Sequence, residues 1–198
     1  MQPAVRSAKQ HQRLRAGGAA RPLVIAVTGT PGTGKTLLLK ALRKQGWRCH
    51  ELNALAIRER LYDRYDPSSK THDVDIPLLA LYVEQRLLTQ QRDAGVPLVL
   101  ASHLSHHLPS RLVDLCVVLR CSIPVLKQRL ARRGYPAKKL RENLDAEIFD
   151  TILVEALDAG HRVLPLDTSE TSPQLLVQRI IKDVRLIRQD RQTLVRRR

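Results

Sequence analysis

A glycine-rich segment near the start of the chain most constrains what this sequence can fold into. It reads Gly-Thr-Pro-Gly-Thr-Gly-Lys-Thr over residues 29–36. An apolar, β-branched run at 23–27 precedes it, and a helix-forming run at 37–44 follows it. Strand, glycine loop and helix at this spacing form the context in which the pattern builds a phosphate-binding loop. A plain turn before a helix is the alternative, and the two flanking runs disfavour it.

The residue types in this loop suit the binding of a nucleoside triphosphate. Glycines let successive backbone N–H groups converge on one point, and the helix N-terminus adds a positive dipole end. Lys35 is predicted to reach the β- and γ-phosphates, and the Thr36 hydroxyl to bind Mg²⁺. We therefore predict that the chain binds a nucleoside triphosphate with Mg²⁺.

Composition restricts the class of protein. At 198 residues with 43% apolar content, the chain has the size and composition of one domain, and its 3% aromatic content predicts an aliphatic core. No apolar run approaches the ~20 residues that span a bilayer. The three cysteines, Cys49, Cys116 and Cys121, lack metal-binding spacing and indicate a reducing compartment. We expect a protein of the cytoplasm, or of the nucleus in a eukaryote, that is neither secreted nor membrane-bound.

The positive charge is concentrated at the two ends of the chain. The formal net charge is +15, and residues 1–22 hold five cations and no acid. The other end, 182–198, finishes on three arginines. We expect a flexible basic arm at 1–22, a folded domain at 23–181 and a basic helix end and tail at 182–198. Such ends favour a polyanionic partner, nucleic acid above all, over the alternative of a merely solvated surface.

Apolar runs and helical periodicity alternate along the rest of the chain. Strands are expected at 23–27, 47–50, 97–101, 115–119 and 163–166. Helices are expected at 37–44, 52–60, 123–133 and 137–157, in a segment that Asp75 caps and that ends before Gly95, and from Pro173 onward. A polar loop is expected at 62–70. This alternation predicts a three-layer α/β fold with a parallel, doubly wound sheet.

Two further segments carry candidate phosphate-handling residues. Arg129 and Arg133 share a helix face next to a Gly-Tyr-Pro break, which is typical of a lid that closes over phosphates. A solvated basic helix end is the alternative. The acceptor of a phosphoryl group is expected at 52–75, where Arg58 is the best anion ligand.

At this point the sequence resembles a known family, the adenylate kinase isoenzyme six type, over about 23–181. Its members are nucleoside monophosphate kinase-like ATPases of small-ribosomal-subunit assembly. The resemblance rests on Ile25–Thr36, Arg58, Leu61-Tyr62-Asp63, Tyr65-Asp66, Val118-Leu119-Arg120, Arg129-Leu130, Arg133-Gly134-Tyr135, Glu142-Asn143 and Ala146-Glu147-Ile148.

The resemblance implies an adenylate kinase-like P-loop fold with ATP and Mg²⁺ as cofactors. It implies an AMP-binding region at about 52–75 and a short lid at about 132–142, with Arg133 on the nucleotide. It implies AMP kinase activity with ATPase activity, and a small-subunit ribosomal protein or rRNA as partner. The residues implied in ATP binding are Gly32, Gly34, Lys35, Thr36 and, through its backbone, Leu37.

One position departs from the pattern of this family. After the third strand the family usually shows an acid, one spacer and a histidine, whereas this chain reads Ala101-Ser102-His103. Such an acid would hold the water bound to Mg²⁺, so its absence puts the rate of phosphoryl transfer by this chain in question. His103 could position a water molecule or be merely structural. A metal cluster with His106 and His107 is a further alternative, without an evident carboxylate or cysteine to complete it.

The predicted catalytic residues are Lys35, His103, Arg129 and Arg133. We expect an ATP-dependent AMP kinase and ATPase that acts in small-subunit biogenesis and rRNA maturation. Two alternatives stay open at this point. One is a different small-molecule kinase on the same scaffold, and the other is a nucleotide-binding assembly factor with negligible turnover.

Overall fold

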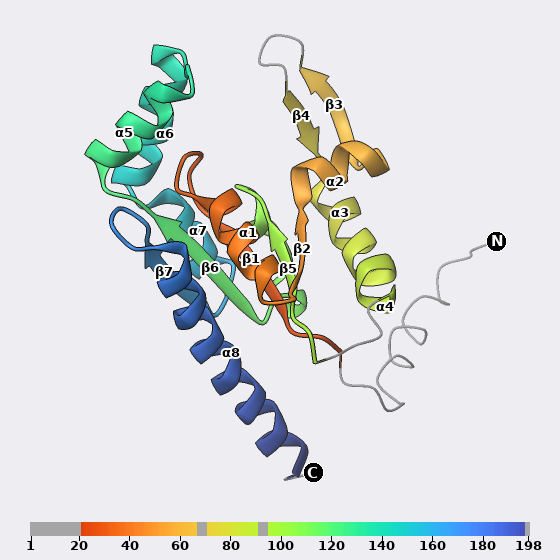
Figure 1. Cartoon of the computed structure of the whole chain (residues 1–198). Helices are drawn as coiled ribbons and strands as arrows, with labels where there is room; N and C mark the ends of the chain where they lie inside the picture. Colours follow the sequence, from red (N-terminus) through yellow and green to blue (C-terminus); the bar gives the residue numbers. More distant parts are fainter. Residues whose placement is uncertain (1–20, 67–70, 91–94, 197–198) are drawn as a thin grey trace, which may run out of the picture.

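The centre of the molecule is a five-stranded, all-parallel sheet. A computed structural model describes residues 21–66, 71–90 and 95–196 of the chain. The strand order is β2-β5-β1-β6-β7, with the glycine-loop strand in the middle (Figure 1). This is the doubly wound parallel sheet that the sequence predicts. The strands are β1 (Val24–Thr28), β2 (Arg48–Glu51), β5 (Leu98–Ala101), β6 (Leu115–Arg120) and β7 (Val163–Asp167).

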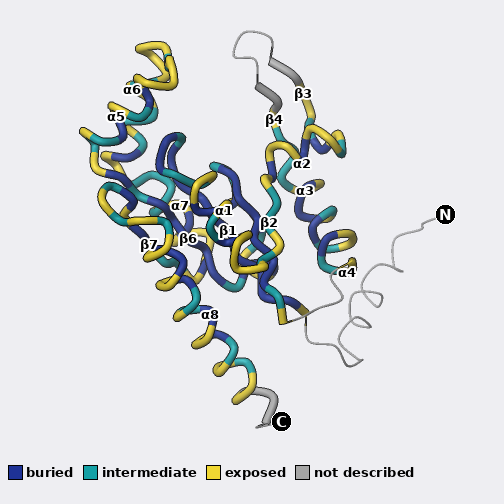
Figure 2. Tube along the Cα trace, viewed as in Figure 1, coloured by how far each residue is buried: buried dark blue, intermediate teal, exposed yellow. Residues whose placement is uncertain are grey.

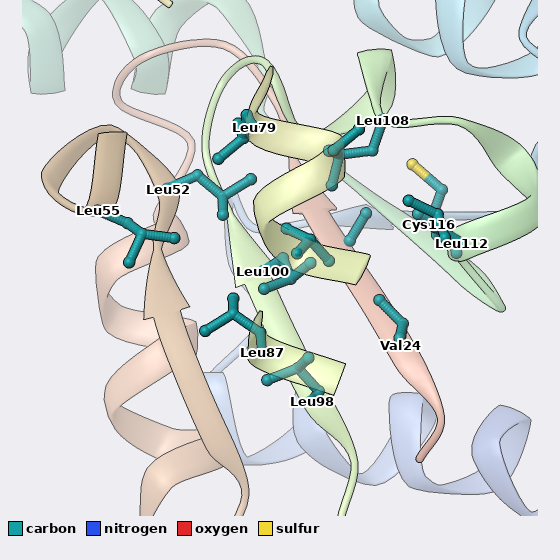
Figure 3. Packing of buried hydrophobic residues seen from close by; sticks show 14 of the residues in the cluster. Val24, Leu52, Leu55, Leu79, Leu87, Leu98, Leu100, Leu108, Leu112 and Cys116 are labelled. Carbon is teal, nitrogen blue, oxygen red and sulfur yellow. The ribbon is translucent and has the colours of Figure 1, made fainter. Parts of the chain in front are cut away.

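Helices cover both faces of the sheet and produce three layers. Along β1, Val24 and Ala26 belong to the core of one face, and Ile25 and Val27 to the core of the other. Such strands read as continuous apolar runs because both faces are buried. One face packs on α1 (Lys35–Lys44) and α8 (Pro173–Arg196), and the other on α2 (Leu52–Glu59), α3 (Ile76–Tyr82), α4 (Leu88–Gln90) and α7 (Thr151–Asp158). Figure 3 shows the aliphatic packing on this second face.

Near both ends of the described chain, residues predicted to lie outside the folded domain make contacts with it. The helix α8 continues past residue 181, and Val184 and Ile187 on its later turns are buried in the core. Arg21, which falls within the predicted basic arm, forms an ion pair with Asp114. Pro22, the last residue of the predicted arm, is buried, and residues 1–20 lie outside the described residues.

Two predictions of local structure are wrong. The segment 62–70, expected to be a polar loop, contributes β3 (Tyr62–Asp66), which pairs antiparallel with β4 (Thr71–Val74). The helix expected over 137–157 is two helices, α6 (Ala137–Ile148) and α7. Asp150 separates them with a backbone φ of 54°, a left-handed conformation that does not continue a helix.

The helical segment after Asp75 agrees with its prediction at the N-terminus and differs in its interior. The Asp75 carboxylate accepts a hydrogen bond from the Leu78 N–H, as an N-cap does. A π-helical turn, Val83–Leu87, follows α3 and leads into α4. Within the described residues, none of the helices is both long and apolar enough to cross a membrane.

Two projections rise beyond the carboxyl edge of the sheet. One consists of α5 (Ile123–Arg132) and α6, and the other of α2 with the β3–β4 hairpin (Figure 1). Much of the outer surface of α5 and α6 is exposed, whereas the three inner strands of the sheet, β1, β5 and β6, are buried (Figure 2). Parallel α/β folds bind ligands at this edge.

Candidate functional site

The glycine loop joins β1 to α1 at the carboxyl edge of the sheet. Gly32 has a φ of 95°, and a Cβ atom there would lie 2.9 Å from Leu126 and 3.0 Å from Leu130 of α5. Gly34 has a φ of 98° and is the N-cap of α1, without a side-chain cap. Only glycine combines this backbone conformation with so close an approach. The uncapped N-terminus of α1 therefore retains the free N–H groups that bind anions.

A cavity of about 320 Å³ opens at this loop. Among the predicted ATP-site residues, Gly32, Gly34, Lys35, Thr36 and Arg133 line it, as does His103. The rest of its lining is Pro31, Leu39, Glu51, Asn53, Ala101, Ser102, Tyr135 and Lys139. The structure therefore brings most of the predicted nucleotide-binding residues into one cavity.

The side chain of Lys35 lies against the backbone of the glycine loop. Its Nζ donates to the carbonyl oxygens of Gly29 and, at 3.1 Å, of Thr30. Burial, with the positive charge of Arg133 as the second cause, lowers the pKa of Lys35 to about 8. An anion beside this ammonium would favour its charged form and oppose that shift. The site is thus electrostatically suited to phosphate.

His103 is held as a neutral imidazole. The Asn53 Oδ1 accepts a 2.6 Å hydrogen bond from the Ser102 hydroxyl, which leaves the Asn53 amide to donate to His103 Nδ1 at 3.4 Å. The proton of the ring is then on Nε2. Burial, together with the charge of Lys35, lowers the pKa of His103 to about 4. At neutral pH this ring is a hydrogen-bond donor at Nε2.

The histidine cluster considered on the sequence does not include His103. His106 is buried, its Nδ1 lies 2.9 Å from the Thr28 hydroxyl, and its Nε2 lies 2.8 Å from Glu155. Glu155 supplies a carboxylate that the sequence does not suggest, because ligand atoms of His106, His107 and Glu155 all lie within 4.8 Å of one another. Both nitrogens of His106 already have protein partners, which favours a structural role.

The two predicted catalytic arginines point to different places. Arg133 lies at the end of α5 and lines the cavity. Arg129 instead donates to the Thr168 carbonyl oxygen at 2.8 Å, to the Thr168 hydroxyl at 3.1 Å and to Cys121 Sγ at 3.4 Å. Arg129 therefore connects α5 to the segment after β7 and lies outside the cavity lining.

Two other predicted ligands also lie outside the lining of the cavity. Arg58, on α2, pairs with the adjacent Glu59 at 2.8 Å and is largely exposed. Leu37 is 60% exposed, and its N–H donates to the Gly34 carbonyl oxygen at 3.0 Å. Their contacts with AMP and with ATP stay predictions.

Sequence reasoning missed several residues of the site. Glu51 is the last residue of β2 and Asn53 lies two residues later, and the rule that ligands bind where parallel strands end could have found them. Tyr135 lies in a motif quoted for the resemblance and Lys139 within the predicted lid, yet neither was given a role.

Glu147 connects α6 to the glycine loop. Its carboxylate is buried and accepts hydrogen bonds from the Thr30 hydroxyl at 2.6 Å and from the Cys121 N–H at 2.8 Å. The second bond is at the end of β6, so one side chain joins the loop, the sheet and α6. Only the folded chain reveals this arrangement, because Thr30 and Glu147 are 117 residues apart.

Comparisons with known proteins identify the family of this chain. A family model described as an AAA domain matches residues 25–150. Proteins named "putative adenylate kinase" from Pyrococcus abyssi and Thermococcus onnurineus are 39% and 37% identical to this chain over 160 residues, 80% of this chain and 82% of each relative. The chain belongs to this adenylate kinase-like family.

Solved structures place the fold of this family member among P-loop kinases. A shikimate kinase from Acinetobacter baumannii in complex with shikimate matches with a TM-score of 0.56 at 15% identity, over 82% of this chain and 93% of its own. A sugar kinase from a Janibacter species matches with a TM-score of 0.53 at 19% identity, over 81% of this chain and 93% of its own. At such identities the likeness concerns the fold alone.

Proposed function

We propose that the chain transfers the γ-phosphoryl group of ATP to AMP, giving two ADP, and to water more slowly. The observation that carries this proposal is the cavity in which Lys35, Arg133 and the uncapped N-terminus of α1 converge. The names of the relatives support adenylate kinase chemistry over other phosphotransfer reactions.

The loop backbone, Lys35, Arg133 and His103 each have a task in such a transfer. The backbone N–H groups of the loop hold the phosphates, and Lys35 and Arg133 neutralise charge that develops on the moving group. The acceptor oxygen of AMP belongs to an ionised phosphate, so its attack needs no general base. This agrees with His103, whose neutral ring with the proton on Nε2 can orient a phosphate oxygen or a water molecule.

The lining of the cavity also suits Mg²⁺. This ion prefers oxygen ligands and is usually held by one or two carboxylates or hydroxyls together with phosphates. The Thr36 hydroxyl and the Glu51 carboxylate are such groups. When bound, Mg²⁺ would offset the negative charge of the β- and γ-phosphates.

The acceptor site is proposed at 52–75, where α2 and the β3–β4 hairpin border the carboxyl edge. Arg58 would reach an AMP phosphate only by leaving Glu59. An exposed ion pair of this kind is worth about 0–1 kcal/mol, so the rearrangement costs little.

A direct assay tests the proposed reaction. The wild-type protein is incubated with Mg²⁺-ATP with and without AMP, CMP or hydroxyl acceptors, and the products are separated by chromatography. We expect ADP to form fastest with AMP, at two ADP per ATP consumed. Preference for another acceptor would identify a different small-molecule kinase. ATP binding without turnover would identify a nucleotide-binding assembly factor.

A role in small-subunit biogenesis with an RNA-rich partner is the second proposed function. Exposed cations on α1 and α8, which pack side by side, support it together with the basic ends of the sequence. The exposed cations are Lys40, Arg43, Lys44, Arg179, Lys182 and Arg185.

Removal of residues 1–20 tests this second function and keeps Arg21 on Asp114. We expect weaker RNA binding, and a salt dependence flatter by about 0.7 to 0.9 for each lost phosphate contact. Nucleotide chemistry should be unchanged. Equal affinity and salt dependence in the two proteins would contradict an RNA-binding arm.

A further inference from the structure

The sheet places an acidic residue beside the position where this chain lacks the acid of the family pattern. In the parallel pair β2–β5, Glu51 is in register with Ala101, the last residue of β5. Ala101 is in turn in register with Val27 of β1, one residue before Thr28 at the base of the glycine loop. Glu51 and Ala101 therefore lie at the same level of the carboxyl edge, and both line the cavity.

The Glu51 carboxylate is available for a ligand. Glu51 is the exposed last residue of β2 and the N-cap of α2, but its side chain makes no capping hydrogen bond. Among the described residues its carboxylate has no ion pair or hydrogen bond. Glu147, the other glutamate near the loop, is buried with both oxygens bonded and lies outside the cavity lining.

The charges around Glu51 indicate what kind of ligand it faces. The ionised side chains that line the cavity besides Glu51 are the cations Lys35, Arg133 and Lys139. These cations attract phosphates, whereas a carboxylate in the same cavity repels them. A divalent cation between the carboxylate and the phosphates converts that repulsion into two attractions. The Thr36 hydroxyl, in the same lining, is a second oxygen ligand for such an ion.

We propose that Glu51 supplies the carboxylate that this chain lacks at position 101 and directs it toward Mg²⁺ or the water molecules that surround the ion. The inference rests on the proposed function, because it requires the cavity to bind Mg²⁺-ATP. The carboxylate would then come from β2, the strand that pairs with β5.

The variant Glu51→Gln tests this role by removing the charge while keeping the size of the side chain. ATP affinity is measured calorimetrically with EDTA and then with saturating Mg²⁺, and Mn²⁺ bound with ATP is followed by electron paramagnetic resonance. With EDTA we expect affinity equal to or tighter than that of the wild type, because a repulsive charge is gone. We expect the affinity gained from Mg²⁺ to fall by about 10-fold, as outer ligands of metals typically contribute.

The matched control is Glu84→Gln. Glu84 is a partly exposed glutamate that pairs with Arg111 and lies outside the cavity lining. Its substitution should leave ATP binding unchanged both with EDTA and with Mg²⁺. A Mg²⁺-dependent gain in Glu51→Gln equal to that in the wild type would overturn the role of Glu51 while leaving ATP binding intact. A wild-type protein that binds no ATP would overturn the proposed function itself.

A second variant transfers the carboxylate back to β5. The double variant Glu51→Gln/Ala101→Asp should recover most of the Mg²⁺-dependent gain, because the two positions are adjacent in register. In the wild-type background, Ala101→Asp should add less, since two neighbouring carboxylates repel each other. If the double variant is folded by thermal melting and recovers nothing, Glu51 and position 101 do not share a function and the proposal is wrong. If Ala101→Asp prevents folding, the Glu51→Gln measurement decides alone.

Discussion

The two edges of the same sheet use charged side chains in opposite ways. At the amino edge, Asp114 accepts hydrogen bonds from the Val24 N–H at 2.8 Å and from Arg21 at 2.9 Å, and it also pairs with Arg191. At the carboxyl edge, the hydrogen bonds of the Lys35 ammonium within the described residues go only to carbonyl oxygens, and Arg133 lines an open cavity. Asp114 is thus paired at the first edge, whereas at the second edge Arg120 pairs with Asp150 but, among the described residues, no carboxylate pairs with Lys35 or Arg133.

This difference separates stability from function. A carboxylate that holds the start of β1, the segment before it and α8 contributes to the fold. A lysine whose pKa burial lowers to about 8 and a histidine whose pKa it lowers to about 4 both lie at the other edge. Perturbed groups in a cavity are typical of functional sites, because folding alone would favour pairing them. Substitutions at the two edges test this division between stability and function.

The largest expected effect is that of Lys35→Ala at the carboxyl edge. Loss of a cation that stabilises charge in the transition state should reduce turnover by about 100- to 1,000-fold. The melting temperature should not fall, because burial in the folded protein disfavours the charged form of Lys35. Lys40→Ala, at an exposed position of the same helix, is the control and should keep wild-type turnover. Near-normal turnover in Lys35→Ala would contradict the assignment of the loop.

Asp114→Ala should show the reverse pattern at the amino edge. It leaves two arginines and one buried N–H without their partner, so we expect a loss of about 2–3 kcal/mol in the free energy of unfolding. Turnover below the melting temperature should stay within about 2-fold of the wild type. Urea denaturation and the ADP assay measure the two quantities. Asp190→Ala, at an exposed ion pair with Arg162, is the control and should cost less than ~0.5 kcal/mol. A large loss of turnover would place Asp114 in the functional machinery.

The variants Arg133→Ala and Arg129→Ala compare a residue that lines the cavity with a residue that holds the fold together, both near the end of α5. Arg133→Ala should lower turnover by about 10-fold or more and ATP affinity less, because a lid residue acts mainly in the closed state. Arg129→Ala should lower the free energy of unfolding by about 1 kcal/mol through its lost bonds to Thr168. Kinetic measurements give the turnover and ATP affinity of both variants, and denaturation gives their free energy of unfolding. If Arg129→Ala lowered turnover and Arg133→Ala lowered only the free energy of unfolding, Arg129 and not Arg133 would belong to the functional site.

The smallest expected effect concerns His103 and pH. Its pKa is about 4 in the folded protein and 6.5 for an unperturbed histidine. Between these values the unfolded chain binds a proton that the folded chain does not, so stability falls as pH decreases from 6.5 to 4. His103→Asn should remove part of this decrease, on the order of 1 kcal/mol after solvent screening. Urea unfolding of both proteins from pH 4 to pH 7 measures it. Parallel stability curves would show that His103 is not held neutral by the fold.

The sequence by itself determined the features that depend on neighbouring residues. The strands of the sheet, the glycine loop and the Asp75 cap follow from apolar runs, spacing and local hydrogen bonding, all of which act over a few residues. For the same reason Lys35 and Thr36 could be placed in the site directly, since they follow the loop without interruption. The P-loop α/β fold was predictable because its alternation of strands and helices is written along the chain.

Only the tertiary structure decided which of the remaining charged residues belong to the site. Arg129 and Arg133 look alike in the sequence, yet one packs on Thr168 and the other lines the cavity. Glu51 becomes a candidate because strand register sets it beside Ala101, 50 residues away in the chain. Contacts of this kind depend on how strands pair and on which helix face meets the core, and neighbouring residues alone do not encode either.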